Sequence, residues 1–460
     1  MLNYIDLYYN SVIIIPGVII MLKIGYIGVG NRGTSMLGNV LDCFKDKVEI
    51  VAVCDLFEDR VQKGVDLVKL KTGYTPFGTT NSDEVMKLDL DAVMVMAAWE
   101  AHIPLAVAAM KAGKHVAMEV AGAYSLDDCF RLVRTSEETG KGCMLLENCC
   151  YGRTELAVLR MVREGLFGEI VHCSGGYFHD LRIEVAIGPV TRHYRNRNYY
   201  SRNGENYPTH ELGPIAKVLD INRGNRMVSL VSVASKARGL KEFAKKEGER
   251  LHSMLDNSEN RETTVNYYGR EYPLNDEIMD SYYKANAREV KQGDIVNTII
   301  TCADGSTISL TLDTTLPRAY SRGFTVRGTK GMYMEDNNSI YLDGNEEMEK
   351  VHFRWHEQWD NAKDYIEKYK HPVWEKYGEA AATSGHDGID YMVLAAFFEA
   401  LEKNKPFPID VYDAASWMCI TCLSEESIAH GGMPVAIPDF TSGKWTMYKR
   451  EDHGLDFALD

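Results

Sequence analysis

The chain has 460 residues, of which 45% are hydrophobic and 25% are charged, a composition typical of a globular protein. This length exceeds what one hydrophobic core usually needs, so we expect two domains. The formal net charge of −15 argues against nucleic acid and anionic membrane surfaces as partners. The ten cysteines are scattered. We therefore expect neither a disulfide framework nor a metal site, and a reducing compartment.

The first 20 residues form an atypical leader that we expect to lie outside the folded structure. They contain the apolar run SVIIIPGVII, but this run is short, contains Pro16 and follows Asp6 rather than lysines. A signal peptide begins with basic residues, and a membrane span needs about 20 apolar residues. We therefore place the start of the folded chain at Met21 and expect a cytoplasmic protein without membrane contact.

Residues 23–55 follow the order strand, glycine turn, helix, strand, acidic residue. The strand in KIGYIGVGNRG breaks into Gly28, Gly30 and Gly33. In this order the first glycine permits a tight turn and the second lets the backbone approach a pyrophosphate. The third lets the helix lie close to the strand. The free N–H groups of the helix N-terminus favour phosphates, so this stretch predicts a dinucleotide site.

Asp55 ends the second strand, where a carboxylate can accept hydrogen bonds from the adenosine ribose. Its charge would repel a 2′-phosphate, so NAD is favoured over NADP, although Arg32 could offset this repulsion. A glycine-rich turn in an α/β domain without cofactor is the alternative interpretation.

The alternation of strands and helices continues to about residue 150. Apolar strands are expected at 90–97, 115–120 and 143–148, separated by helices, as in a buried parallel sheet. Ligands bind at the C-terminal ends of such strands, which here carry Trp99, His102, Glu119 and Asn148. Residues 21–150 are therefore predicted to form a Rossmann domain with a doubly wound parallel sheet.

Residues 151–460 are expected to form an α+β domain with a large open, mostly antiparallel sheet. Its strands are predicted near 169–177, 227–235, 294–302, 307–315, 323–327 and 339–342. Late helices at 389–401 and 414–428 should pack back on the rest of the chain. Residues 238–292 are rich in charge, Asn and Tyr, which predicts a surface insertion, either a lid or mobile decoration.

A polar, aromatic stretch precedes the helix expected at 212–219. It contains Arg195, Arg202 and the run Tyr207, Pro208, Thr209, His210. A Tyr and a His three residues apart can face the same cavity. Histidine exchanges protons near neutral pH, and the Tyr hydroxyl can donate or accept a hydrogen bond. We therefore predict an acid/base site here, with a purely structural His210 as the alternative.

Several segments resemble the Gfo/Idh/MocA oxidoreductase superfamily and, within it, the NAD-dependent glycosidases of glycoside hydrolase family 109. They are IGVGNRG, WEAH, MEV, LLENCCYGR, GGYFHDLR, RNGENYPTH, PRAYSRGFTVRGTKG and IDVYDAASWMCI. The resemblance extends from Met21 to about Trp445, and residues 238–292 match poorly. It implies a Rossmann domain joined to an open sheet, NAD that stays bound through turnover, and activity on glycosides such as α-N-acetylgalactosaminides.

Carried over to this sequence, the resemblance implies two sets of contacts. NAD contacts are implied at Asn31, Arg32, Asp55, Trp99, His102, Glu119, Val120 and Asn148, and sugar contacts at Tyr177, Arg195, Tyr207, Pro208, Thr209, His210 and Tyr320. Two positions depart from the family pattern. Ala121 stands where a proline is usual, and Glu211 stands where glycine is common, so an added carboxylate beside the site could change the sugar accepted.

The mechanism implied by the resemblance is oxidation of the sugar at C3 by NAD⁺, followed by elimination. The C3 ketone makes the C2 proton acidic, a base removes it, the glycosidic oxygen leaves, water adds, and the hydride returns. His210, Tyr177 and Tyr207 are the predicted catalytic residues. His210 and Tyr177 would act as acid and base, while Tyr207 and Tyr320 position the sugar.

Two other functions stay open from the sequence. One is a sugar or inositol dehydrogenase that releases NADH, although the Lys of the usual Glu-Lys-Pro motif is replaced by Val120. The other is a dinucleotide-binding sensor without enzymatic activity. The identity of the sugar and the oligomeric state are not fixed by the sequence, and a homo-oligomer is compatible with it.

Overall fold

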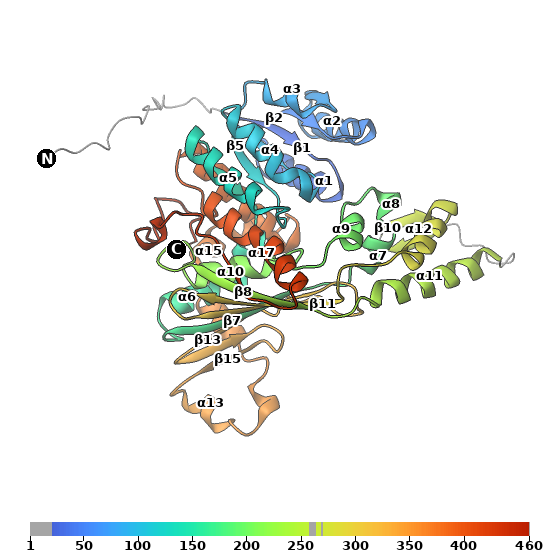
Figure 1. Ribbon diagram of the computed structural model, residues 1–460. Helices are drawn as coiled ribbons and strands as arrows, with labels where there is room; N and C mark the ends of the chain where they lie inside the picture. Colours follow the sequence, from blue (N-terminus) through green and yellow to red (C-terminus); the bar gives the residue numbers. More distant parts are fainter. Residues whose placement is uncertain (1–20, 257–263, 268–269, 460) are drawn as a thin grey trace.

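The computed structural model describes residues 21–256, 264–267 and 270–459, so the predicted leader lies outside the described residues. The chain forms two layers built around separate β-sheets (Figure 1). The sheet nearer the N-terminus lies at the top of Figure 1, the larger sheet lies below it, and helices fill the space between them.

The first sheet has six strands in the order β3-β2-β1-β4-β5-β6, and every pairing is parallel. This strand order reverses direction at β1, as in dinucleotide-binding folds. The strands are β1 (Leu22–Ile27), β2 (Val48–Cys54), β3 (Phe77–Thr79), β4 (Ala92–Val95), β5 (His115–Met118) and β6 (Cys143–Leu145). The central strand β4 is buried along its whole length, which confirms the predicted Rossmann sheet.

The helices of this domain connect successive strands. They are α1 (Asn31–Cys43), α2 (Glu58–Thr72), α3 (Ser82–Met86), α4 (Trp99–Lys111) and α5 (Leu126–Thr139). Ser125 caps α5 by accepting a hydrogen bond from the Asp128 N–H at 3.1 Å. Both α1 and α4 begin within a few residues of a strand end, so their N-termini lie at the C-terminal edge of the sheet.

The second sheet has eight strands in the order β15-β14-β13-β7-β12-β11-β8-β16. They are β7 (Ile170–Phe178), β8 (Met227–Ala234), β11 (Ile295–Cys302), β12 (Thr307–Asp313), β13 (Thr325–Gly328), β14 (Gly331–Met334), β15 (Ser339–Leu342) and β16 (Val435–Ala436). Strands β7 and β12 pair in parallel and the other pairs are antiparallel, which confirms the predicted sheet. The sequence did not indicate β14, a short strand that directly follows the turn after β13.

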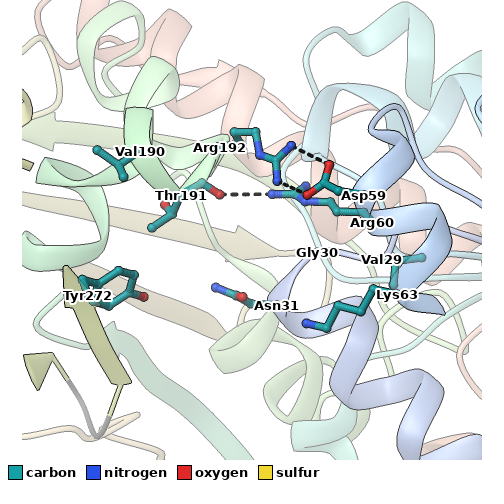
Figure 2. A pocket seen from close by; sticks show the side chains of 10 residues that line it. All are labelled: Val29, Gly30, Asn31, Asp59, Arg60, Lys63, Val190, Thr191, Arg192 and Tyr272. Carbon is teal, nitrogen blue, oxygen red and sulfur yellow. Dashed lines mark hydrogen bonds and ion pairs between the residues drawn. The ribbon is translucent and has the colours of Figure 1, made fainter. Parts of the chain in front are cut away.

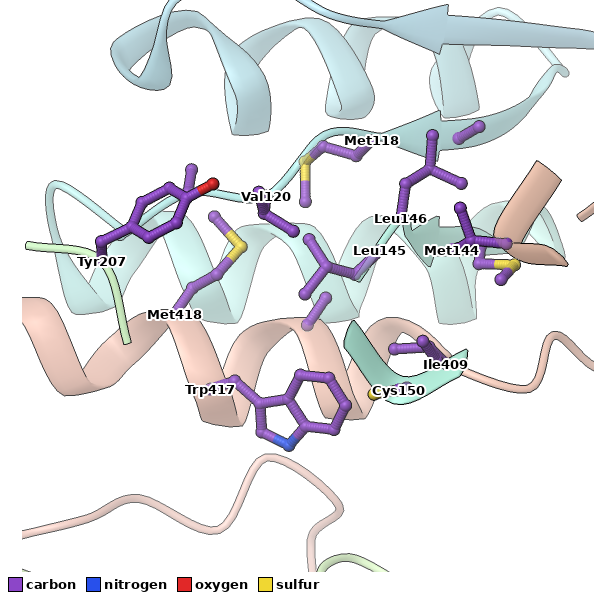
Figure 3. Packing of buried hydrophobic residues seen from close by; sticks show 14 of the residues in the cluster. Met118, Val120, Met144, Leu145, Leu146, Cys150, Tyr207, Ile409, Trp417 and Met418 are labelled. Atoms are coloured by element: carbon purple, nitrogen blue, oxygen red, sulfur yellow. The ribbon is translucent and has the colours of Figure 1, made fainter. Parts of the chain in front are cut away.

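Helices α10 (Thr209–Val218) and α17 (Val411–Ala429) cover the face of this sheet that looks toward the Rossmann domain (Figure 1). Helix α17 also contacts α5 and β6, and α16 (Ile389–Glu402) contacts α1. Figure 3 shows Trp417 and Met418 of α17 in one buried layer with Leu145 and Met118 of the Rossmann strands. The late helices therefore join the two sheets into one core.

The described part of residues 238–292 packs as a helical layer beside the second sheet. Helices α11 (Gly239–Asp256) and α12 (Asp276–Ala287) contact each other and also contact α7 (Arg182–Ala186). The short hairpin of β9 (Thr264–Tyr267) and β10 (Arg270–Pro273) lies between them in the chain. Leu251 and Tyr282 are fully buried, so this segment has an apolar core of its own.

The remaining elements are short. They are η1 (Asn148–Tyr151), α6 (Arg153–Arg163), α8 (Gly188–Thr191), α9 (Arg195–Ser201), α13 (Glu346–Lys350), η2 (Trp355–Gln358), α14 (Lys363–Lys368), α15 (Pro372–Ala381), η3 (His386–Gly388) and η4 (Lys444–Thr446). Among the helices that the structure describes, none combines the length and the apolar character needed to cross a bilayer.

Candidate active site

The three glycines of the first turn have different surroundings. Gly28 has a φ of +103°, and a Cβ there would lie 2.4 Å from the Met96 carbonyl oxygen. A Cβ on Gly33 would lie 2.0 Å from the Gly28 carbonyl oxygen, so only glycine allows α1 to approach the turn this closely. A Cβ on Gly30 would meet nothing closer than Arg60 Nη1 at 3.7 Å, because Gly30 faces open space. These are the three positions that the dinucleotide turn requires.

A cavity of about 260 Å³ opens beside this turn (Figure 2). Its lining comes from the glycine turn, α2, α8 with the residue after it, and β10: Val29, Gly30, Asn31, Asp59, Arg60, Lys63, Val190, Thr191, Arg192 and Tyr272. Arg192 pairs with Asp59 at 2.6 Å, and Arg60 donates to the Thr191 carbonyl at 3.1 Å. Three basic side chains against one acidic side chain, at a helix N-terminus, favour an anionic ligand.

Asp55 lies under the turn with its carboxylate held by the backbone. It accepts hydrogen bonds from Val29 N at 2.7 Å and from Phe57 N at 3.1 Å, and it is buried. These bonds fix the carboxylate at the end of β2, the position from which a Rossmann acid meets a ribose.

Arg32 forms ion pairs with two carboxylates that lie on other parts of the chain. Its Nε donates to Glu119 at 2.7 Å, and its two terminal nitrogens donate to the two oxygens of Asp390 at 2.8 Å each. Asn148 also donates to Asp390, at 2.8 Å. Burial would raise the pKa of Asp390, but His386 and Arg32 lower it well below its ordinary value. Arg32 thus forms its ion pairs with Glu119 and Asp390 and not with Asp55.

The ends of β4 and β5 supply a second group of buried side chains. The Trp99 indole N–H has no hydrogen-bond partner among the described residues, although the ring is buried. His102 Nε2 bonds to the Ala97 carbonyl at 2.8 Å, and burial lowers the pKa of His102. Glu119 Oε2 accepts from the N–H of Val120, and Val120 lies in the same buried layer as Tyr207 (Figure 3). A buried donor without a partner indicates a missing acceptor, as a bound ligand would supply.

Tyr207 and His210 meet at the start of α10. The helix begins at Thr209, directly after Pro208, so Tyr207 and His210 lie one helical turn apart. Their ring centroids are 4.8 Å apart, and the Tyr207 hydroxyl lies 3.4 Å from His210 Nε2. Thr209 is fully buried between them.

Glu147 holds the other side of the His210 ring, and the sequence analysis did not single it out. It lies directly after β6 with no exposed surface, and its Oε1 is 2.7 Å from His210 Nδ1. Burial raises the pKa of Glu147, but His210 outweighs this effect and lowers the pKa below its ordinary value. Glu147 is therefore a buried carboxylate that is hydrogen-bonded to the His210 ring. Its place at a strand end, next to the predicted Asn148, was the available signal.

Tyr177, at the end of β7, completes an aromatic cluster with these residues. Its ring lies 4.5 Å from Tyr207 and 5.6 Å from His210, measured between centroids. Burial raises the pKa of Tyr177 to about 12, so its hydroxyl is neutral at physiological pH. That hydroxyl lies 3.0 Å from Nδ1 of His179, whose pKa burial and Arg195 lower to about 4. His179 is a second candidate site residue that the sequence did not indicate.

Arg195 and Tyr320 lie at different depths of this cluster. The buried guanidinium of Arg195 lies over Trp99, Tyr177 and Tyr207, with centroid distances of 5.4, 5.8 and 5.0 Å, and donates to Glu184 at 2.8 Å. Tyr320 lies further out, with its ring edge-on to His179 at 5.1 Å. The structure thus brings together Tyr177, Arg195, Tyr207 and His210 beside Trp99, and places Tyr320 at their rim.

Glu211 does not add a charge to the site. It is buried against Gly175 of β7, two residues before Tyr177. Burial and the neighbouring Glu205 raise the pKa of Glu211 well above its ordinary value, so the side chain is a neutral carboxyl. The expected additional carboxylate is therefore corrected to a protonated, buried group.

Glu147, Cys149 and His210 have potential ligand atoms within 4.8 Å of one another. Two of these atoms already form the Glu147–His210 hydrogen bond. Burial raises the pKa of the Cys149 thiol well above its ordinary value, and a protonated thiol is a poor metal ligand.

Two family models match the chain. The NAD-binding Rossmann fold of an oxidoreductase family matches residues 22–146. The C-terminal domain of glycosyl hydrolase 109 matches residues 151–267 and 248–447. The first match ends at residue 146 and the second begins at residue 151.

Curated relatives extend this similarity over most of the chain. An alpha-N-acetylgalactosaminidase of Tannerella forsythia is 39% identical, with 92% of this chain and 87% of the relative covered. A glycosyl hydrolase family 109 protein of Stenotrophomonas maltophilia is 37% identical, with 93% and 91% covered.

Solved structures show the same fold at low identity. An NAD-binding oxidoreductase from Klebsiella pneumoniae has a TM-score of 0.62 at 13% identity, with 91% of this chain and 99% of that chain covered. The WlbA dehydrogenase from Bordetella pertussis, solved with NADH and UDP-GlcNAcA, has a TM-score of 0.59 at 15% identity, with 91% and 98% covered.

Proposed function

The chain belongs to the glycosyl hydrolase 109 family, and from this premise we propose that it is an NAD-dependent glycosidase acting on α-linked N-acetylgalactosaminides. The sugar is taken from the name of the T. forsythia relative. The observation that carries the proposal is the Glu147–His210–Tyr207 arrangement beside the Tyr177–His179 pair. Together they form a cluster of hydrogen-bonded side chains at the strand ends near a dinucleotide turn.

The residues around the turn fit NAD. Gly30 leaves open space, the basic cavity favours a diphosphate, and Asp55 stands at the position for a ribose. Asn31 and Asp55 would hold the adenosine half, while Trp99, Glu119, Val120 and Asn148 would hold the nicotinamide half. When bound, NAD supplies reversible hydride exchange with C3 of the sugar.

His210 is the proton carrier in this proposal. Glu147 orients its ring through Nδ1 and stabilises the charged imidazole that forms when His210 takes a proton. Nε2, the other ring nitrogen, faces the Tyr207 hydroxyl and the aromatic cluster. The neutral hydroxyl of Tyr177 forms a hydrogen bond with His179 and is placed to hydrogen-bond the sugar. Arg195, held by Glu184, places positive charge where an enolate would carry negative charge.

The carboxyl groups of this pocket do not form the pair that ordinary glycosidases use. Those enzymes flank the scissile bond with one acidic and one nucleophilic or basic carboxyl. Here Glu147 is bonded to His210, Glu184 is paired with Arg195, and Glu211 is a neutral buried carboxyl. This arrangement supports elimination through an oxidised sugar over direct displacement.

A sugar dehydrogenase that releases NADH is the alternative, and the fold it shares with the solved oxidoreductases does not separate the two. Two activities of this kind can be separated by incubating the protein, without added cofactor, with a panel of α- and β-linked N-acetylhexosaminides and plain hexosides. We expect release of the aglycone from the α-N-acetylgalactosaminide with no lasting rise in absorbance at about 340 nm, the NADH band. Stoichiometric NADH formation with added NAD⁺, and no cleavage, would overturn the proposal.

A further inference from the structure

Three large aromatic side chains are exposed in residues 353–359, which follow the edge strand β15 and α13. Phe353, Trp355 and Trp359 are 87%, 74% and 55% exposed, and we refer to them as the aromatic platform. Aromatic side chains contribute more than most residues to recognition, and clustered exposed ones mark binding surfaces.

The backbone that carries the platform is held in place by hydrogen bonds. The Gln358 side chain donates to the carbonyls of Val351 and His352, at 2.8 Å each. The Asn361 amide accepts from Ile340 N at 2.8 Å and donates to its carbonyl at 3.0 Å, so it covers the edge of β15. The rings are therefore presented by a fixed segment, which reduces the entropy lost on binding.

The rim of the candidate active site is also aromatic and exposed. Tyr320 is 54% exposed, and its ring meets His179, which in turn lies 3.0 Å from the Tyr177 hydroxyl. Tyr320 thus links the buried pocket to the surface at the end of β7.

A short series of contacts connects this rim to the platform. Ser321, next to Tyr320, hydrogen-bonds Asp336 in the turn between β14 and β15. The following residue, Asn337, accepts from the N–H of Asp360, which is adjacent to Trp359, at 3.0 Å. Strands β7, β13, β14 and β15 are successive neighbours, so β7 and β15 are about 14 Å apart across the sheet. Trp359 and the pocket therefore lie at the same end of the sheet.

We propose that the aromatic platform binds the part of a glycan substrate that extends beyond the bond cleaved in the pocket. This inference rests on the proposed function. The apolar C–H face of a sugar ring stacks on the electron-rich face of an aromatic ring. A glycan whose terminal sugar lies against Tyr177 and His210 has to leave the pocket at its exposed rim, and Tyr320 leads toward the platform. Arg354 beside the platform is paired with Glu357 at 2.9 Å, and acidic residues outnumber basic ones in residues 346–364, which disfavours an anionic glycan.

The test compares a short and a long substrate on the same variants. The short one is para-nitrophenyl α-N-acetylgalactosaminide, and the long one is an oligosaccharide that ends in the same sugar. We expect W355A and W359A to lower kcat/KM for the oligosaccharide about tenfold, with unchanged kcat/KM for the short glycoside. Trp355→Phe should restore most of the loss because it keeps a stacking face. L70A, at an 80% exposed apolar position on α2, is the matched control and should change neither value.

Equal kinetics of the wild type and the platform variants on both substrates would overturn the inference while leaving the proposed function intact. Failure of the wild type to cleave either substrate would instead contradict the proposed function. In that case, titration of the oligosaccharide followed by tryptophan fluorescence tests the platform directly, and unaltered affinity of W355A overturns it. Light scattering separates a further outcome: a lower molecular mass for W355A would show that the platform joins copies of this chain, which also overturns it.

Discussion

The cofactor turn and the sugar pocket are built in different ways. The turn is formed by consecutive residues from Gly28 to Gly33, and its geometry lies in the backbone. The pocket is assembled from side chains far apart in the chain, including Glu147, Tyr177 and His210, which meet only because η1, β7 and α10 pack together. A local motif therefore identifies the first site, whereas the second depends on tertiary structure.

The largest expected effect tests whether catalysis in the pocket can be lost while NAD stays bound at the turn. His210→Ala should lower kcat by about 10³-fold because it removes the proton carrier, with the amount of NAD in the purified protein unchanged. An activity assay gives kcat, and the NAD released from a denatured sample gives the cofactor content. His430→Ala, at an exposed helix end, is the control. Near-normal activity of the His210 variant would contradict the assignment.

A smaller loss is expected from the carboxylate behind His210. Glu147→Gln keeps the shape of the side chain but removes the charge that stabilises the imidazolium, so we expect kcat to fall about 10²-fold. Steady-state kinetics measure this loss, and an unaltered kcat of the variant would leave Glu147 with a purely structural role.

The turn itself is tested by filling its open space. Gly30→Val places its Cβ in the cavity, where the nearest neighbour of that atom would be Arg60 Nη1 at 3.7 Å. We expect NAD affinity to fall at least about tenfold, with the thermal midpoint of the apoprotein preserved. Gly38→Val, within helix α1 and with no atom within 4 Å of the added Cβ, should retain NAD. Added NAD should restore part of the activity of the Gly30 variant.

The smallest effect concerns stability rather than catalysis. Burial raises the pKa of Glu205, two residues before Tyr207, to about 8. Its unfolded pKa is about 4.3, so the folded state binds the proton more tightly. The tighter binding of this proton contributes fully to the free energy of unfolding below about pH 4.3. The contribution is lost as the pH rises through about 8. Glu205→Gln should raise the thermal midpoint by a few degrees above pH 8 relative to the wild type, with no gain near pH 4.

The fold and the turn could be predicted because their signals are local. Apolar runs ending in Asp55 or Asn148 predict parallel strands and their C-terminal edge, and the structure confirms the parallel sheet. The short strand β3 is an addition that the sequence did not indicate. Glu147 and His179 were missed because a carboxyl or an imidazole beside a predicted residue has no pattern of its own. Their roles depend on contacts with His210 and Tyr177 across the chain. The neutral state of Glu211 likewise depends on burial, which the sequence does not specify.

The pairing of Arg32 with Asp390 imposes an order on how this protein is made. The two residues are separated by 358 positions, so the ribosome produces the glycine turn long before the acid that fixes its arginine. Asn148, which donates a hydrogen bond to the same carboxylate, precedes it by 242 positions. A nascent N-terminal half can form its parallel sheet, but its cofactor edge is completed only when α16 folds back onto it. A chain cut short before that helix would leave Arg32 and Asn148 without Asp390 and the turn without its final support.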